Sequence, residues 1–213
     1  MKSLSIAQEY VLCSLNTKGD LPPLSIKIPV CVVASGLIEL LLSNCIKVNE
    51  NKKLCVINGL GAEQVYLKSL FDSLNKPRPI EIKEIALEYN LSFTNKRLNA
   101  LVADIGNSLA DRDCVTIEKG GILGNESYFI PNPDEVDRVI QKIRAELLES
   151  GTVSDETVAL ASLLEEGNQI RNYFSKYELK QLNVRLKEIK KASSNQLLKQ
   201  MLDYVDSFMI GLS

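Results

Sequence analysis

The sequence has no histidine and no tryptophan among its 213 residues. Histidine is the most common metal ligand in proteins and the only side chain that titrates near neutral pH without a perturbed environment. Its absence excludes histidine-dependent triads, HExxH zinc sites and most acid–base schemes that operate near pH 7. The sequence therefore predicts no catalytic residues, no metal site and no cofactor, and we expect a protein that is not an enzyme.

Long hydrophobic segments are also missing. No stretch reaches the roughly 18 to 20 apolar residues that cross a bilayer, and the first residues lack the apolar region of a signal peptide. The sequence therefore predicts a soluble protein of the cytoplasm. Five cysteines are present, an odd number without C-x-x-C spacing, so neither a disulfide framework nor a zinc site is indicated. We expect buried thiols at Cys13, Cys31, Cys45, Cys55 and Cys114.

Positive charge is not in excess. The formal net charge is −2 and the pI is near 5.4, which argues against a protein whose main task is to neutralise phosphates. A local basic face is still compatible with these values. Apolar residues make up 45% of the chain, which is ample for a packed core.

Helical patterns dominate the sequence. Ser5-Ile-Ala-Gln8 has the form of a capping box and predicts a helix that continues through Leu15. Residues 29–43 are almost continuously apolar, with Glu39 as the only charge. About fifteen residues at 1.5 Å each span roughly 22 Å, which is less than the ~30 Å hydrocarbon layer. We therefore expect a helix that is buried on all sides at the centre of the domain.

Short β-segments and further helices complete the pattern. Residues 46–57 predict one β-hairpin, and residues 114–131 predict a second. Helical spacing or N-cap signals predict further helices at about 62–74, 82–89 and 98–109, and after Asn132, Ser154, Ser175 and Asn195. The expected fold is mainly α: a single helical domain over residues 1–213 around a buried apolar central helix, with two small β-hairpins and a possible sub-boundary at 75–79.

The second hairpin has an unusual tip. Ile122 and Leu123 lie between glycines at the turn, where Gly, Asn, Asp, Ser and Pro are the usual residues. One interpretation is that the tip folds back on its own domain, or that Ile122 belongs to a displaced strand. The alternative is that the tip enters a membrane surface or a neighbouring subunit.

The order helix, turn, helix, hairpin over residues 80–131 is also typical of a winged helix that binds DNA. A DNA-binding protein of this kind makes about six to ten phosphate contacts. Here the second helix carries Asp104 and Asp111, and acidic residues outnumber basic residues across the segment. Nucleic acid is therefore an unlikely partner, although a winged-helix regulator is kept as an alternative.

The chain resembles the Golgi phosphoprotein 3-like family and is most similar to its bacterial members. The resemblance lies in four segments and in the basic helix that follows the last of them: residues 4–12, 34–42, 107–115 and 153–164. It implies a mostly helical single domain around a buried apolar helix. It also implies a hydrophobic hairpin that is used in membrane contact and in self-association.

The resemblance further implies a headgroup pocket for a phosphoinositide, which in the Golgi members is made by a tryptophan and several arginines. In this sequence Leu24 aligns with the tryptophan, and Val33, Asn99 and Val102 align with the arginines. Nearby basic residues, Lys27, Lys96 and Arg97, replace part of the lost charge. Acidic phospholipid in general is therefore the expected ligand.

The leading hypothesis is a non-catalytic protein that associates peripherally with membranes from the cytoplasm. Ile122 and Leu123 would enter the bilayer surface, and basic residues would bind the anionic headgroups: Lys27, Lys96, Arg97 and Lys119. Because a single hairpin would bind weakly, we also expect a homo-oligomer. The alternatives are the winged-helix regulator and a protein-interaction domain whose hairpin only assembles subunits.

Overall fold

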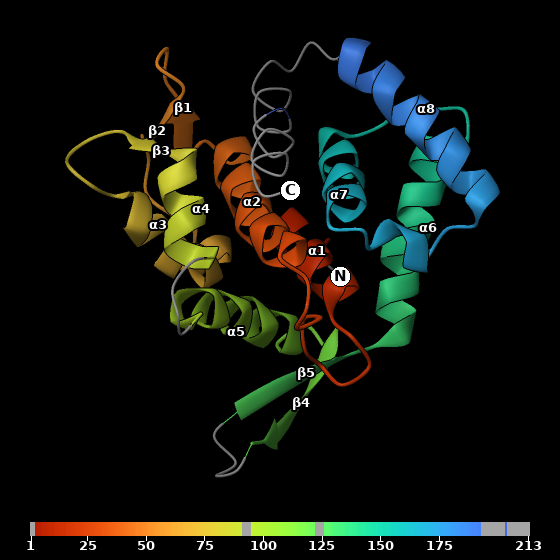
Figure 1. Cartoon of the computed structure of the whole chain (residues 1–213), viewed down its shortest axis with the longest axis horizontal. Coiled ribbons are helices and arrows are strands. Elements are labelled where there is room, and N and C mark those ends of the chain that lie inside the picture. Colours follow the sequence, from red (N-terminus) through yellow and green to blue (C-terminus); the bar gives the residue numbers. More distant parts are fainter. Residues whose placement is uncertain (1–2, 91–94, 122–125, 193–202, 204–213) are drawn as a thin grey trace.

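The computed structural model describes residues 3–90, 95–121, 126–192 and 203, and within them the chain is mainly helical, as predicted (Figure 1). The α-helices are α1 (Ile6–Ser14), α2 (Lys27–Leu42), α3 (Lys68–Leu74), α4 (Ile82–Asn90), α5 (Lys96–Ala110), α6 (Pro133–Leu148), α7 (Asp155–Glu166) and α8 (Lys176–Ala192). Two 3-10 helices are η1 (Ala62–Leu67) and η2 (Ile170–Asn172). The strands are β1 (Ile46–Val48), β2 (Lys53–Val56), β3 (Ile80–Glu81), β4 (Val115–Gly120) and β5 (Glu126–Pro131). The helix predicted from Asn195 lies outside the described residues.

The predicted N-caps begin their helices. The Ser5 hydroxyl accepts a hydrogen bond from the Gln8 amide at 3.3 Å, and the Gln8 side chain accepts one from the Ser5 amide at 3.1 Å. The Asn132 side chain likewise accepts from the Asp134 amide, with Pro133 as the first residue of α6. These bonds satisfy amide groups that have no partner within the helix, so short polar side chains determine where α1 and α6 begin.

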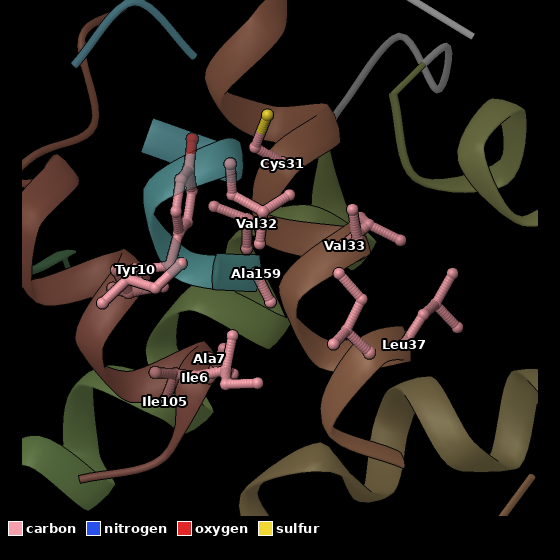
Figure 2. Close-up of a cluster of buried hydrophobic side chains, with 14 of the residues drawn as sticks. Ile6, Ala7, Tyr10, Cys31, Val32, Val33, Leu37, Ile105 and Ala159 are labelled. Atoms are coloured by element: carbon pink, nitrogen blue, oxygen red, sulfur yellow. The ribbon is translucent and has the colours of Figure 1, made fainter. Parts of the chain in front are cut away.

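The hydrophobic core forms where α2 meets its neighbours. Residues 28 and 30–41 of α2 are buried, and the helix packs against α1, α3, α4, α5 and α7. Figure 2 shows part of this core, with side chains from α1, α2, α5 and α7 in one cluster: Ile6, Ala7, Tyr10, Cys31, Val32, Val33, Leu37, Ile105 and Ala159. A helix that is apolar on every side is stable in water only when other elements cover it in this way.

Helix α1 is buried along its whole length, and its two long polar side chains have partners on other helices. Gln8 donates from Nε2 to the hydroxyl of Ser108 on α5 at 3.0 Å. Glu9 pairs with Lys142 of α6 at 2.5 Å. Because buried polar groups are costly unless they are paired, these contacts fix α1 between α5 and α6.

Two elements differ from the sequence prediction. The β-hairpin predicted at residues 46–57 is part of a three-stranded antiparallel sheet in the order β1-β2-β3. The third strand follows residues 75–79 in the chain, and its Ile80 pairs with Leu54. The predicted helix at 62–74 is divided into η1 and α3. A two-residue strand has no periodicity of its own, and its pairing depends on contacts far away in the sequence.

Helices α6, α7 and α8 pack together with η2, and they lie on the side of α2 opposite to α3 and α4 (Figure 1). The predicted capping box of α8 is present, since Ser175 and Glu178 exchange side chain to amide hydrogen bonds at 2.7 and 3.3 Å. Arg144 of α6 donates to Glu178 at 2.9 Å and lies 4.8 Å from the centre of the Phe174 ring. The start of α8 is therefore attached to α6.

The second predicted hairpin is confirmed as the antiparallel pair β4–β5. Its register runs from Val115 opposite Pro131 to Gly120 opposite Glu126. In Figure 1 this hairpin extends away from the helical body, and its base lies beside the end of α5 and the loop between α1 and α2.

Four of the five cysteines are buried, as predicted, whereas Cys55 is half-buried. Cys55 follows Leu54, which is buried, and successive side chains of a strand point to opposite faces. Among the residues that the structure describes, no helix is both long and apolar enough to cross a bilayer.

Candidate functional site

A pocket of about 1190 Å³ lies at the base of the β4–β5 hairpin. Three segments that are far apart in the sequence form its walls. The first is the loop between α1 and α2 with the start of α2, within residues 16–29. The second is the first half of α5 with Asn95, and the third is residues 126–129 of β5. Pockets at the junction of several elements are the usual places for ligands.

The loop wall is shaped by a tight turn at residues 16–20. Asn16 accepts hydrogen bonds through its side-chain oxygen from the amides of Lys18 at 2.7 Å and Asp20 at 3.2 Å. Gly19 has a φ of +82°, a conformation that other L-residues rarely adopt. Two residues therefore determine the turn: the side chain of Asn16 accepts the amide hydrogen bonds, and Gly19 adopts the positive φ.

Phe129 of β5 joins the three walls. Its amide donates a hydrogen bond to the Gly19 carbonyl at 3.0 Å, which attaches the loop to the hairpin. Its ring is only 3% exposed and lies against Gly106 of α5, where an added Cβ would be 2.6 Å from the ring. The pocket is thus held in shape by a buried aromatic side chain and by two close backbone approaches.

The described lining of the pocket contains more negative than positive charge. Its ionisable carboxylates are Asp20 and Glu126, and its cation is Lys18. Burial and the nearby charge of Glu126 raise the pKa of Asp20, while Lys18 acts in the opposite direction. Tyr128 donates a hydrogen bond to Glu126 at 2.7 Å, and this bond raises the pKa of the Tyr128 hydroxyl.

Three of the four predicted headgroup-binding cations are next to lining residues of this pocket, either in the chain or through a hydrogen bond. Lys27 follows Ile26, which lines the pocket, and Lys96 follows Asn95, which also lines it. Lys119 of β4 donates from Nζ to the hydroxyl of Ser127 on the pocket wall at 2.7 Å. The described lining of the pocket contains none of these three lysines, and only Lys119 has a recorded contact with a lining residue.

Arg97, the fourth predicted cation, has a partner on another helix. It forms an ion pair with Glu88 of α4, and Lys76 lies 3.4 Å from the same carboxylate. The charge of Arg97 is thus partly balanced within the protein. No local pattern in the sequence indicates this contact, since Glu88 and Arg97 lie on different helices.

The predicted tip residues Ile122 and Leu123 lie outside the described residues, so their role stays a prediction. Two other exposed apolar side chains were missed as functional candidates. Leu24 is 98% exposed and Ile26 is 65% exposed, and both belong to the loop that forms the first pocket wall. The signal in the sequence was the run LPPLSI, in which leucines flank two consecutive prolines in a loop.

Helix α5, which would be the recognition helix of a winged-helix protein, packs against α1, α3, α4 and η1. Asp104 of α5 and Asp111, which directly follows the helix, are exposed. Asp104 lies 3.4 Å from the hydroxyl of Ser69, and burial raises its pKa. The exposed surface of α5 therefore combines the cations Lys96 and Arg97 at its start with the carboxylate of Asp104 further along, and this carboxylate would repel duplex phosphates.

A second pocket of about 500 Å³ is lined in part by Glu39, the acidic residue of the largely apolar α2. Glu39 accepts hydrogen bonds from the Tyr66 hydroxyl at 2.5 Å and from the Ala7 amide at 3.2 Å. Burial raises the pKa of Glu39 despite these bonds. Because both oxygens of Glu39 are engaged by the protein itself, we assign this carboxyl group a structural role.

No group of three or more cysteine, aspartate or glutamate side chains in the described part of the chain is arranged to hold a metal ion.

Comparison with known proteins gives one family. The family model described as Golgi phosphoprotein 3 (GPP34) matches residues 6–206, which is nearly the whole chain. The family resemblance seen in the sequence is therefore confirmed. No curated protein matches the chain.

Proposed function

The chain belongs to the Golgi phosphoprotein 3 family, and on this premise we propose that it is a non-catalytic module that binds peripherally to anionic phospholipid membranes. The membrane-binding face comprises the rim of the pocket at the hairpin base and the hairpin itself. By resemblance to the family, the lipid headgroup is of the phosphoinositide type.

The observation that supports this proposal is that exposed apolar side chains belong to the loop wall of one pocket, while predicted cations are next to its lining residues in the chain or through a hydrogen bond. Leu24 and Ile26 supply the apolar part, and Lys27, Lys96 and Lys119 supply the charge. Peripheral membrane proteins combine these two features, since apolar side chains enter the headgroup boundary while lysines attract anionic lipid.

The energies are sufficient for reversible binding. Burying a leucine or isoleucine side chain contributes roughly 1.5 to 3 kcal/mol, and each lysine near an anionic surface adds about 1 kcal/mol. The costs of association reduce this sum. A second protomer on the same surface would compensate for those costs through avidity. The proposal therefore includes a homo-oligomer, with Ile122 and Leu123 of the hairpin in membrane contact or in self-association.

Sedimentation with liposomes tests the proposal. Wild-type protein is expected to pellet with vesicles that contain phosphatidylglycerol or phosphatidylinositol 4-phosphate, and to remain in solution with phosphatidylcholine alone. Leu24→Asp should weaken pelleting about 10- to 100-fold, the factor that corresponds to the burial of one leucine. The hairpin variant Ile122→Asp with Leu123→Asp should also weaken it.

The matched control is Val184→Asp on α8. Val184 is a 54% exposed apolar residue, and α8 contributes no residue to the described lining of the pocket. This variant should pellet like the wild type. Pelleting that is independent of anionic lipid would contradict the proposal. A hairpin variant that changes only the oligomeric state would favour assembly, and salt-sensitive retention of duplex DNA would favour a regulator.

A further inference from the structure

The chain contains a single asparagine that is followed directly by glycine, Asn58 before Gly59. Both residues are exposed and belong to the loop between β2 and η1. In such a pair the main-chain nitrogen of the second residue can attack the side-chain carbonyl carbon of the asparagine. Glycine favours this reaction, because it has no Cβ beside the nitrogen and its backbone adopts more conformations than that of other residues.

The attacking nitrogen is not engaged by the described part of the protein. The Gly59 amide has no hydrogen-bond partner there. A Cβ built at Gly59 would have no atom within 4 Å apart from its neighbours in the chain, so nothing crowds this residue. Asn107, which precedes the small residue Ser108, is also exposed but lies within α5. There the helix fixes the backbone and uses the following amide in a hydrogen bond, so Asn107 should be stable.

The side chain of Asn58 attaches the loop to the end of α2. Its Nδ2 donates a hydrogen bond to the carbonyl of Asn44 at 2.8 Å, and Asn44 directly follows the C-cap of α2. The main-chain amides of Ile57 and Asn58 both donate to the carbonyl of Cys45, at 2.9 and 3.2 Å. Because the side-chain bond is at the surface, water competes for it, and the side chain is able to turn towards the Gly59 nitrogen.

Cys45 lies next to the same loop. It is only 2% exposed, and its sulfur lies 3.4 Å from the carbonyl oxygen of Gly59 and 3.6 Å from Oε1 of Gln64. A shift of Gly59 away from this sulfur would open a path for water and thiol reagents. The position of the loop therefore controls access to a buried thiol.

We propose that Asn58 is a site of spontaneous deamidation, and that its product loosens the loop next to Cys45. The Gly59 nitrogen loses its proton to water or hydroxide and attacks Cγ of Asn58. A bond forms between this nitrogen and Cγ, the bond from Cγ to Nδ2 breaks, and ammonia leaves with a proton from solvent. Water then opens the cyclic imide at either carbonyl carbon, which gives aspartate or isoaspartate. Water is the only co-reactant, and no oxidation or reduction takes place.

Both products lose the hydrogen bond to Asn44. A carboxylate has no proton to donate, and its charge would lie beside the Asn44 carbonyl oxygen, which repels it. Isoaspartate also lengthens the main chain by one carbon before Gly59, which displaces the Gly59 carbonyl from the sulfur of Cys45. Local opening should then expose the thiol more often. This inference does not depend on the proposed membrane function.

Peptide mapping of the full chain by mass spectrometry tests the modification. After incubation at mildly alkaline pH, aspartate and isoaspartate should be found at position 58, whereas Asn107 keeps its amide. The rate should rise with pH, because the attacking nitrogen must lose a proton. Gly59→Ala is the matched variant, since a Cβ fits at this position and should shield the nitrogen, so the modification should be lost over the same incubation.

A free peptide of residues 55–61 gives the rate in the absence of the fold. The inference is overturned if Asn58 keeps its amide in the intact protein while the free peptide is converted. It is equally overturned if Gly59→Ala is modified as fast as the wild type, because the reaction would then not proceed through the Gly59 nitrogen.

Asn58→Asp tests the consequence for Cys45. Labelling of Cys45 by a thiol reagent, located by mass spectrometry, should be about two- to tenfold faster than in the wild type, the factor that corresponds to the net loss of one hydrogen bond. Asn51→Asp is the control, because it adds the same charge at an exposed asparagine whose side chain makes no hydrogen bond to the described residues. Equal labelling of Cys45 in Asn58→Asp and the wild type would overturn the link between the two residues.

Discussion

We predict that Gly106→Ala destabilises the protein through a clash with Phe129. Gly106 is buried in α5, and a Cβ added there would lie 2.6 Å from one ring carbon of Phe129 and 2.7 Å from two others. The ring is only 3% exposed and is surrounded by other atoms, so it cannot rotate into solvent. Forcing an extra carbon into a packed core typically costs about 1 to 3 kcal/mol.

Helix propensity acts in the opposite direction. Alanine is a better helix former than glycine by roughly 0.5 to 1 kcal/mol. We therefore expect Gly106→Ala to lower the free energy of unfolding by about 0 to 2.5 kcal/mol in the wild type. In a Phe129→Ala background the clash disappears, and the same substitution should raise the free energy of unfolding by about 0.5 to 1 kcal/mol.

A double-mutant cycle measures the difference. Urea unfolding followed by circular dichroism would give the four free energies of unfolding, and the coupling energy between the two positions should be about 1 to 3 kcal/mol. Phe129→Ala alone should cost about 3 to 5 kcal/mol, so Phe129→Leu is a milder second background. Gly151→Ala is the control, because an added Cβ there has no atom within 4 Å.

The reasoning is refuted if Gly106→Ala costs the same in both backgrounds. That result would mean that the ring does not limit the space at Gly106. It would also remove the physical basis for the contact that holds the hairpin base against α5, and with it the rigidity assigned to the pocket.

Two further predictions concern pH. Burial raises the pKa of Glu39 above 4.5, so the folded state favours its protonated form. The wild type should therefore lose stability relative to Glu39→Gln as the pH rises from about 4.5 through the raised pKa. A difference in urea midpoint that does not change with pH would contradict this prediction. The amide of Ser175 and the side chain of Arg144 lower the pKa of Glu178 to about 2. Glu178→Gln should therefore melt below wild type at neutral pH, and this gap in melting temperature should close as the pH falls from about 4.5 towards 2.

Local signals in the sequence predicted the starts of α1, α6 and α8 correctly. The boxes at Ser5 and Ser175 and the cap at Asn132 depend on residues two or three positions away, so the sequence contains both partners of each contact. The strand β3 and the division between η1 and α3 depend on pairing and packing with distant segments. Such contacts have no signal within a short window.

The candidate site was predictable only in part. Basic residues and the family resemblance pointed to Lys27, Lys96 and Lys119, and their role stays a prediction, since only Lys119 contacts a residue of the pocket lining. The exposure of Leu24 was not predicted, because an apolar residue in a loop is as often buried as exposed. The excess of negative charge in the pocket lining was also not predicted, since Asp20 and Glu126 are more than one hundred positions apart in the chain.

The hydrogen bond from the Phe129 amide to the Gly19 carbonyl has a practical consequence for mapping the binding region. A shortened chain that ends before residue 126 would retain α1 to α5 but lack one side of the pocket. Deletion variants and isolated fragments would therefore lose binding whichever of the three pocket walls is removed. Single substitutions in the intact chain are the suitable way to assign the contribution of each wall.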